Sequence, residues 1–476
     1  MPARPVRAAV RQARITLNPS NTGKSNMNFT KTVLAAVFTL SAGALAYAQN
    51  PIINSAYCAD PSAHVFNGRV YVYPSHDIPA PYDFSRKDWF CMADYHVYSS
   101  DNLVDWVDHG VIVDQRYVPW VNSRSYSMWA PDCNVKDGKY YFYFPADNRI
   151  GLATADQPYG PFRCETEPIQ GAGGIDPCIF IDDDGACYLI WSGQGMRIAK
   201  LKDNMKEFDG EAKTIQHDTP NRGLKEGPFM FKRNGIYYFT FPWVDDNHEC
   251  LCYCTGDSPW GPFKYQGKIM EQNPQCWTNH HSVVEFKGKW YLFYHHNDYS
   301  PNFDKNRSVC IDEITFNDDG SINLVTPTKR GVGVTKATSQ IQLDRYSKIA
   351  DQNHAWIEFL RTESPFEGWK TVFRNNDSSR NPIWVEYDRV DFGSKELGSV
   401  LVRCQSNVGG TVEVHVDSLQ GPVIATIDIP GKDGGEWQDI KSPVTSQVTG
   451  QHDLFVTMRS GLLMYIDWIQ FIESGN

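Results

Sequence analysis

The chain lacks an excess of positive charge. Its 476 residues carry a formal net charge of −11. Without the six basic side chains of the first 48 residues, the net charge falls to about −17. So acidic a chain is a poor partner for nucleic acid or anionic membranes. A neutral partner such as a glycan fits this charge better.

The cysteines lack the spacings of a zinc site. There are twelve of them, and none belongs to a CxxC or a Cys/His pattern. Cys250, Cys252 and Cys254 alternate along one predicted strand, so they share a face and cannot pair with one another. We interpret the cysteines as small buried hydrophobic side chains and leave disulfide pairing open.

The longest N-terminal apolar run, VLAAVFTLSAGAL, has 13 residues, which is too short to span a bilayer. It follows six basic and no acidic side chains and ends near the sequence AYA at 46–48. This pattern predicts a secretory signal peptide over residues 1–48, with Met27 as the more natural start. No cysteine sits at the cleavage point, since the first one is Cys58. We therefore expect an exported protein, periplasmic or extracellular, that is monomeric and has no membrane anchor.

Stretches of helix-favouring residues are scarce, whereas aromatic residues make up 13% of the chain. Five segments combine a turn glycine with an aromatic-rich strand, and most carry Asn-Gly or Asp-Gly, which predicts a β-hairpin. Repeats of about 50 residues with several short strands indicate a β-propeller, here with five blades. The turn glycines are Gly68, Gly138, Gly185, Gly235 and Gly288.

A polar motif precedes each of these glycines by six to nine residues. In a propeller the first strand of each blade lines the central channel, so equivalent positions converge at one end of it. Two carboxyl groups that flank a bond, with a third that keeps one of them protonated, suit glycoside hydrolysis. The motifs are ADPS with Asp60, APDC with Asp132, IDPC with Asp176, KEGP with Glu226, and NHHS with His280.

These motifs, in this order over residues 51–328, resemble glycoside hydrolase family 43. The resemblance implies an inverting hydrolase in which Asp60 is the general base, Glu226 the general acid, and Asp176 raises the pKa of the acid and orients it. It gives Asp132 no chemical role.

The same resemblance implies further contacts. Trp129 would shape the sugar pocket, and Arg307 is a candidate for a hydroxyl contact. His280 falls where the family has a histidine near a bound cation, commonly calcium. Each residue also has a structural alternative, since aromatic, arginine and histidine side chains often serve packing or ion pairs. No organic cofactor is implied.

Beyond a predicted linker at residues 329–340, short alternating segments predict a β-sandwich over residues 341–476, resembling a jelly roll. IQLDRYS, GEWQDI and YIDWIQF are similar to carbohydrate-binding module family 6. That resemblance implies a structural calcium at Asp344 and Asp467. Gln342 and Tyr465 depart from the family pattern at a usual glutamate and a sugar-binding asparagine, so glycan binding by this module stays open.

The sequence therefore predicts an all-β protein with a catalytic propeller over residues 49–328. The expected activity is the removal of α-L-arabinofuranosyl or β-D-xylosyl residues from plant polysaccharide such as arabinoxylan or arabinan. Two alternatives stay open: a non-catalytic glycan-binding propeller, and a hydrolase of the same family with another specificity, such as an endo-arabinanase or a galactan-active enzyme.

Overall fold

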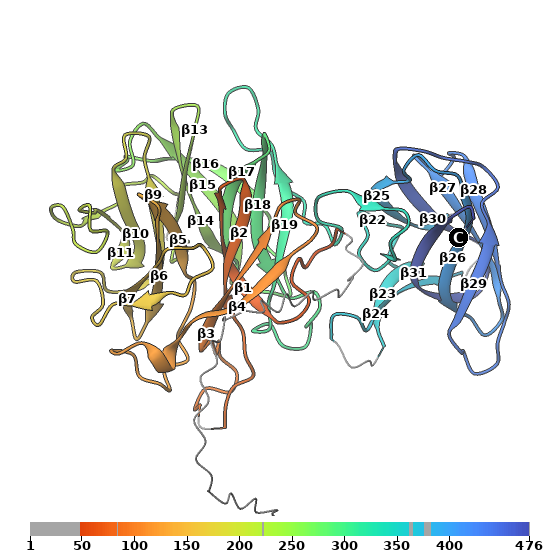
Figure 1. Cartoon of the computed structure of the whole chain (residues 1–476), viewed down its shortest axis with the longest axis horizontal. Coiled ribbons are helices and arrows are strands. Elements are labelled where there is room, and N and C mark those ends of the chain that lie inside the picture. Colours follow the sequence, from red (N-terminus) through yellow and green to blue (C-terminus); the bar gives the residue numbers. More distant parts are fainter. Residues whose placement is uncertain (1–47, 83, 221–222, 361–364, 376–381, 476) are drawn as a thin grey trace, which may run out of the picture. The chain divides into compact units, whose positions relative to one another are not determined.

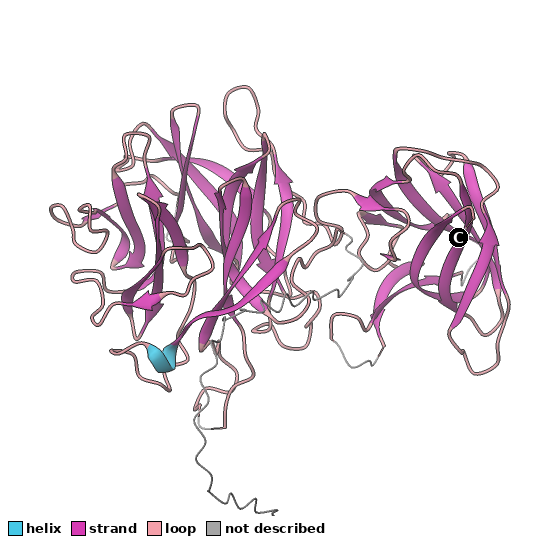
Figure 2. Ribbon diagram, viewed as in Figure 1, coloured by secondary structure: helices cyan, strands magenta, loops and turns pink. Residues whose placement is uncertain are grey.

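A computed structural model of the chain describes residues 48–82, 84–220, 223–360, 365–375 and 382–475. The predicted signal peptide lies outside the described residues, apart from Ala48. The described residues form strands and loops with one short helical turn, η1 (Gln115–Tyr117), shown in cyan in Figure 2. No helix among them has the length and apolar character to cross a bilayer.

The part of the chain that precedes residue 320 forms five antiparallel sheets, one for each repeat (Figure 1). Their first strands make a closed ring, in which β1 lies beside β5, β5 beside β9, β9 beside β13, β13 beside β17, and β17 beside β1. This is the predicted five-bladed propeller. Its strands are β1 (Cys58–Phe66), β2 (Arg69–His76), β3 (Asp94–Ser100), β4 (Val107–Asp114), β5 (Asp132–Lys136), β6 (Lys139–Ala146), β7 (Arg149–Ala155), β8 (Arg163–Cys164), β9 (Ile175–Ile181), β10 (Cys187–Gly193), β11 (Gly195–Lys200), β12 (Lys213–Thr214), β13 (Phe229–Arg233), β14 (Ile236–Asp245), β15 (His248–Gly256), β16 (Lys264–Met270), β17 (His281–Phe286), β18 (Lys289–His296) and β19 (Ser308–Ile314).

The turn between the first two strands of a blade has the predicted geometry in four blades. In the first blade, Asn67 and Gly68 have φ of 52° and 77°, the left-handed pair that a two-residue hairpin turn requires. The third blade differs, because its loop spans residues 182–186 and only Gly185 within it has a positive φ.

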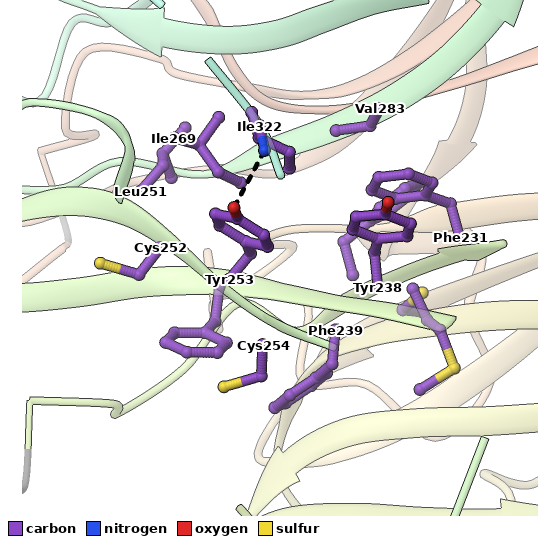
Figure 3. Packing of buried hydrophobic residues seen from close by; sticks show 14 of the residues in the cluster. Phe231, Tyr238, Phe239, Leu251, Cys252, Tyr253, Cys254, Ile269, Val283 and Ile322 are labelled. Carbon is purple, nitrogen blue, oxygen red and sulfur yellow. Dashed lines mark hydrogen bonds between the residues drawn. The ribbon is translucent and has the colours of Figure 1, made fainter. Parts of the chain in front are cut away.

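Aromatic side chains fill the space between blades. Phe231 of the fourth blade packs against Trp290 of the fifth, with ring centroids 5.3 Å apart, and stacks on Tyr238 of its own blade at 4.7 Å. The hydroxyl of Tyr253 accepts a hydrogen bond of 2.9 Å from the backbone N–H of Ile322 (Figure 3). All twelve cysteines lie in the described part of the chain, none is in a disulfide, and all but Cys164 are buried. The cysteines therefore serve as small core side chains, as the sequence predicts.

The C-terminal part forms two six-stranded sheets, one with β25 and β30 at its centre and the other with β24, β31 and β26. Alternate side chains of both sheets, such as Val456 and Ile466, form one buried core, which is the predicted β-sandwich. The predicted linker contains strand β20, in which Thr335 pairs in parallel with Val390 of β25. The strands are β20 (Thr335–Lys336), β21 (Ile341–Gln342), β22 (Lys348–Ile349), β23 (Ala355–Phe359), β24 (Trp369–Arg374), β25 (Ile383–Asp391), β26 (Leu397–Gln405), β27 (Gly410–Val416), β28 (Val423–Ile429), β29 (Gln438–Pro443), β30 (Gln451–Gly461) and β31 (Leu463–Glu473).

Candidate active site

A cavity of about 100 Å³ at the end of the channel collects every site residue predicted for the propeller. All five blades contribute, because equivalent positions at the start of each blade face the same ring. Three aromatic residues that the sequence reasoning did not single out, Trp89, Phe90 and Trp277, also line the cavity. The predicted residues in it are Asp60, Trp129, Asp176, Glu226, His280 and Arg307.

Asp60 and Asp176 share an unusual backbone. Each has a positive φ, 51° and 52°, although neither is glycine. Each also lies where the pairing of the first two strands shifts register, a β-bulge that turns a side chain away from its regular direction. Strain of this kind, about 1–3 kcal/mol per residue, is typical of functional sites. The bulges direct both carboxylates into the cavity.

Asp60 is held in its ionised form. The guanidinium of Arg307 donates to both carboxylate oxygens, at 2.9 and 3.3 Å, and the hydroxyl of Ser75 donates to Oδ2 at 2.6 Å. The backbone N–H of Asp60 donates to Nδ1 of His295 at 3.1 Å. Burial alone would raise the pKa of Asp60, but the charge of Arg307 and the other contacts lower it to about 2. Asp60 is therefore a carboxylate throughout the neutral range.

Arg307 is committed to two carboxylates. Besides Asp60, it binds Asp77 through Nε at 3.0 Å, Nη2 at 2.9 Å and its backbone N–H at 2.8 Å. The guanidinium also lies over the ring of Phe90, 4.6 Å from its centroid. The sequence suggested a contact with a sugar hydroxyl, whereas these bonds make Arg307 the buried counter-ion of Asp60. Asp77 was missed because only the fold brings it to Arg307.

Glu226 lies in the loop that precedes β13, and the next residue ties it to Asp176. The backbone N–H of Gly227 donates to Oδ2 of Asp176 and to Oγ of Ser192, both at 3.1 Å. Gly227 has a φ of +68°, and a Cβ at this position would lie 2.6 Å from the ring of Pro242. Only glycine fits this turn, which explains why the acidic residue is followed by Gly in the motif KEGP.

The pKa values of Asp176 and Glu226 both lie above those of ordinary carboxyl groups. Burial raises the pKa of both groups, and the negative charge of Asp60 raises both further. A third buried carboxyl, Glu249, lies behind them and accepts a 2.7 Å hydrogen bond from the backbone N–H of Asn279. Burial and the charge of Glu226 raise the pKa of Glu249 well above its ordinary value. The site thus combines one carboxylate of lowered pKa with carboxyl groups of raised pKa, a division that acid–base chemistry requires.

The cavity presents unused hydrogen-bonding groups to a ligand. The indole Nε1 atoms of Trp89 and Trp129, Oδ1 of Asn279 and Nε2 of His280 are buried without a hydrogen-bond partner among the described residues. All four residues line the cavity. Aromatic faces beside polar donors and acceptors suit a sugar ring, whose faces are apolar and whose edge carries hydroxyl groups.

Asp132, which the sequence placed at the same register, has a structural role. One of its oxygens accepts from the hydroxyl of Ser62 and from Nε2 of His64 at 2.6 Å, and the other from the backbone N–H of Ile179 at 2.5 Å. These partners belong to the first and third blades, so Asp132 joins three blades. It does not line the cavity.

His280 does not fit direct ligation of calcium. Its Nδ1 accepts a hydrogen bond of 3.0 Å from the backbone N–H of His281, and burial lowers its pKa, so the ring is neutral. The proton therefore lies on Nε2, which faces the cavity as a donor. A cation requires a lone pair at that position, and calcium also prefers oxygen ligands.

Asp344 and Asp467 line a separate cavity and do not fit calcium either. Nζ of Lys370 donates to Asp467 at 2.6 Å and to the backbone oxygen of Glu367 at 2.7 Å. Arg345 lies 3.2 Å from Asp344. Buried cationic side chains thus contact both carboxylates that the sequence assigned to calcium. The sequence reasoning considered departures only at 342 and 465 and missed Lys370.

Comparison with known proteins agrees with this geometry. Residues 48–322 match the model of glycosyl hydrolases family 43, and residues 367–473 match carbohydrate binding module family 6. The chain belongs to glycosyl hydrolase family 43 and is a glycosidase. The family requires no organic cofactor.

Several relatives share most of the chain or all of the propeller. A xylosidase/arabinosidase 43A of Humicola insolens is 41% identical over 325 residues, covering 57% of this chain and 98% of that protein. An arabinoxylan arabinofuranohydrolase of Bacillus subtilis is 30% identical and covers 89% and 92%. Among solved structures, a family 43 β-xylosidase/α-arabinofuranosidase from a compost metagenome, in complex with xylotriose, has a TM-score of 0.53 at 39% identity, covering 59% and 98%.

Proposed function

We propose that this glycosidase removes α-L-arabinofuranosyl or β-D-xylosyl residues from plant polysaccharide such as arabinoxylan. The observation that carries the proposal is the cavity that brings Asp60, held as a carboxylate by Arg307, together with Asp176 and Glu226, whose pKa values are raised. The names of the relatives, which include xylosidase/arabinosidase and arabinoxylan arabinofuranohydrolase, support this substrate class. A non-catalytic glycan-binding propeller would not need this arrangement of charge.

In the proposed mechanism, Glu226 protonates the leaving glycosidic oxygen, and Asp60 removes a proton from the attacking water. Arg307 keeps Asp60 ionised, and Asp176 orients the acid through the backbone of Gly227. Water then attacks the anomeric carbon from the face opposite to the leaving group, and the configuration inverts.

The dimensions favour release of one terminal sugar. The cavity of about 100 Å³ is smaller than the roughly 300–1,000 Å³ that holds drug-sized ligands, so it suits one pentose ring. Trp129 and Ile175 also line a wider cavity of about 660 Å³, which Arg197 and Lys225 make polar. The rest of the glycan chain can extend along that wider space.

Two variants test this assignment with aryl α-L-arabinofuranosides and β-D-xylosides. Loss of a general acid or base costs about 10²- to 10⁴-fold in rate. Glu226→Gln should lose most activity on substrates with poor leaving groups and least on substrates with good ones. Asp60→Asn should lose activity on all of them equally. Glu207→Gln, at an exposed ion pair with Lys202, is the matched control.

Two results would refute the assignment. The first is near wild-type activity in Asp60→Asn or in Glu226→Gln on a poor leaving group. The second is a first-formed product with retained anomeric configuration in a proton NMR time course, which would exclude Asp60 as the base for water.

We also propose that the protein is exported to the periplasm or the medium and that it is monomeric. The basic and apolar N-terminal segment supports export. Any calcium near His280 would have to be held through water, since the imidazole presents a donor. The C-terminal module is proposed to bind glycan, supported by its match to a carbohydrate-binding family. Secretion assays, size-exclusion chromatography and pull-down on insoluble xylan test these points.

A further inference from the structure

Two histidines and an aspartate meet on the first blade, outside the cavity described above. His76 ends β2, and Asp94 and His96 lie two residues apart on the neighbouring strand β3, so their side chains share a face. Because residue 75 pairs with residue 95, His76 is across from Asp94. One ligand atom from each of the three side chains lies within 4.8 Å of the other two.

The three side chains point toward a common position. Nδ1 of His76 is 2.8 Å and Nε2 of His96 is 3.9 Å from Oδ1 of Asp94. The two imidazole rings meet edge to face with centroids 5.1 Å apart. The exposed fractions of the side chains are 21%, 18% and 17%, so an ion could enter from solvent while packing still orders the ligands.

A second carboxylate fixes the tautomer of His96. Nδ1 of His96 is 3.1 Å from Oδ1 of Asp108, on β4. A carboxylate only accepts, so Nδ1 carries the proton and Nε2 turns a lone pair toward Asp94. Asp108 is itself held by the backbone N–H of Gly110 at 2.7 Å. A carboxylate behind a histidine in this way is the usual support of a metal-ligating imidazole.

We propose that His76, Asp94 and His96 form a binding site for a divalent transition metal ion such as zinc, with Asp108 as the supporting carboxylate of His96. Two imidazole nitrogens and one carboxylate oxygen suit Zn²⁺ and its neighbours in the first row. Calcium and magnesium, which take oxygen ligands, suit it poorly. Without metal, Nδ1 of His76 donates its proton to Asp94; when an ion binds at Nδ1, the neutral ring carries its proton on Nε2 instead.

The site adjoins the supports of Asp60. His76 lies between Ser75, which donates to Asp60, and Asp77, which binds Arg307. A metal ion on His76 would therefore fix the end of β2, from which both neighbours reach the catalytic cavity. The inference does not depend on the proposed sugar specificity.

The test is calorimetric titration of the full-length protein with ZnCl₂ at pH 7, after EDTA treatment and dialysis. Wild type should bind one ion per chain. His76→Asn and His96→Asn should weaken binding at least 100-fold, and Asp108→Asn about 10- to 100-fold. His109→Asn, on β4 and bonded to Ser99 at 2.7 Å, is the matched control and should bind like wild type.

Cobalt distinguishes this site from the cysteines. The Co²⁺-loaded protein should show a visible spectrum without a thiolate charge-transfer band, and His96→Asn should abolish it. Circular dichroism in EDTA checks that each variant folds. If a ligand variant does not fold, Asp108→Asn still tests the site, because it keeps all three ligands. Equal zinc affinity in wild type, His96→Asn and Asp108→Asn, or no binding by wild type, would overturn the proposal.

Discussion

Replacing Arg307 with methionine should move the acidic limb of the pH–rate profile. The change removes the positive charge that opposes the effect of burial on Asp60 and leaves a side chain of similar length. The pKa of Asp60 should rise from about 2 to at least its ordinary value of 3.8. That rise of about 1.8 pKa units corresponds to about 2 kcal/mol of lost stabilisation of the carboxylate.

The size of the effect follows from the fraction of Asp60 that is ionised. With a pKa of about 2, roughly 90% is ionised at pH 3, whereas a pKa of 3.8 or higher leaves about 14% or less. The ratio of kcat/KM at pH 3 to that at pH 6 should therefore fall about sixfold or more. This ratio is independent of any loss from misplacement that affects both pH values equally.

The variant also leaves Asp77 buried without its partner. Breaking a buried ion pair costs about 3–5 kcal/mol, so the free energy of unfolding in urea should fall. If the single variant is unstable, the double variant Arg307→Met/Asp77→Asn also removes the unpaired charge of Asp77, so that the pH profile can still be measured. Arg69→Met, paired with the exposed Asp101, is the control. An unchanged pH ratio with a raised KM would refute this reasoning and make Arg307 a substrate contact.

Three further results are expected. The basic limb of the kcat/KM profile should lie above the ordinary pKa of 4.5 of a glutamic acid, because burial and the charge of Asp60 raise the pKa of Glu226; a basic limb at or below that value would contradict this. Gly227→Ala should cost about 1–2 kcal/mol in urea unfolding from its left-handed backbone alone, and kcat should fall as Glu226 shifts; an unchanged kcat would contradict this. After removal of metals, Lys370→Met should be less stable than wild type by about 3–5 kcal/mol and should gain more stability than wild type from added calcium; an equal gain in both proteins would contradict the role given to Lys370.

The propeller and its ring of polar groups could be predicted because both are local and repeated. A turn glycine with an aromatic strand recurs five times, and each recurrence supports the others. Burial of the cysteines on β15 followed from their interpretation as small hydrophobic side chains, and the strand is in fact buried on both faces.

The supports of the site could not be predicted in the same way. Asp77 lies 230 residues from Arg307 in sequence, and Glu249 contacts the backbone of Asn279 across two strands. No local pattern distinguishes these residues from other polar residues near strand ends. The contact of Lys370 with Asp467 was missed for the same reason, since a cationic side chain can come from any strand that passes the site.

The order of Asp and Pro in the sequence motifs differs between blades, and the backbone explains what this difference does. In the first and third blades the acidic residue precedes proline, at 60–61 and 176–177, whereas in the second blade proline precedes Asp132. Proline has no N–H to donate to the strand ladder, so pairing breaks just after Asp60 and Asp176, and the bulge turns them into the cavity. Asp132 is followed by Cys133, pairs with Tyr143 in regular register and joins blades instead. The order of Asp and Pro thus separates the two aspartates of the cavity from the structural one.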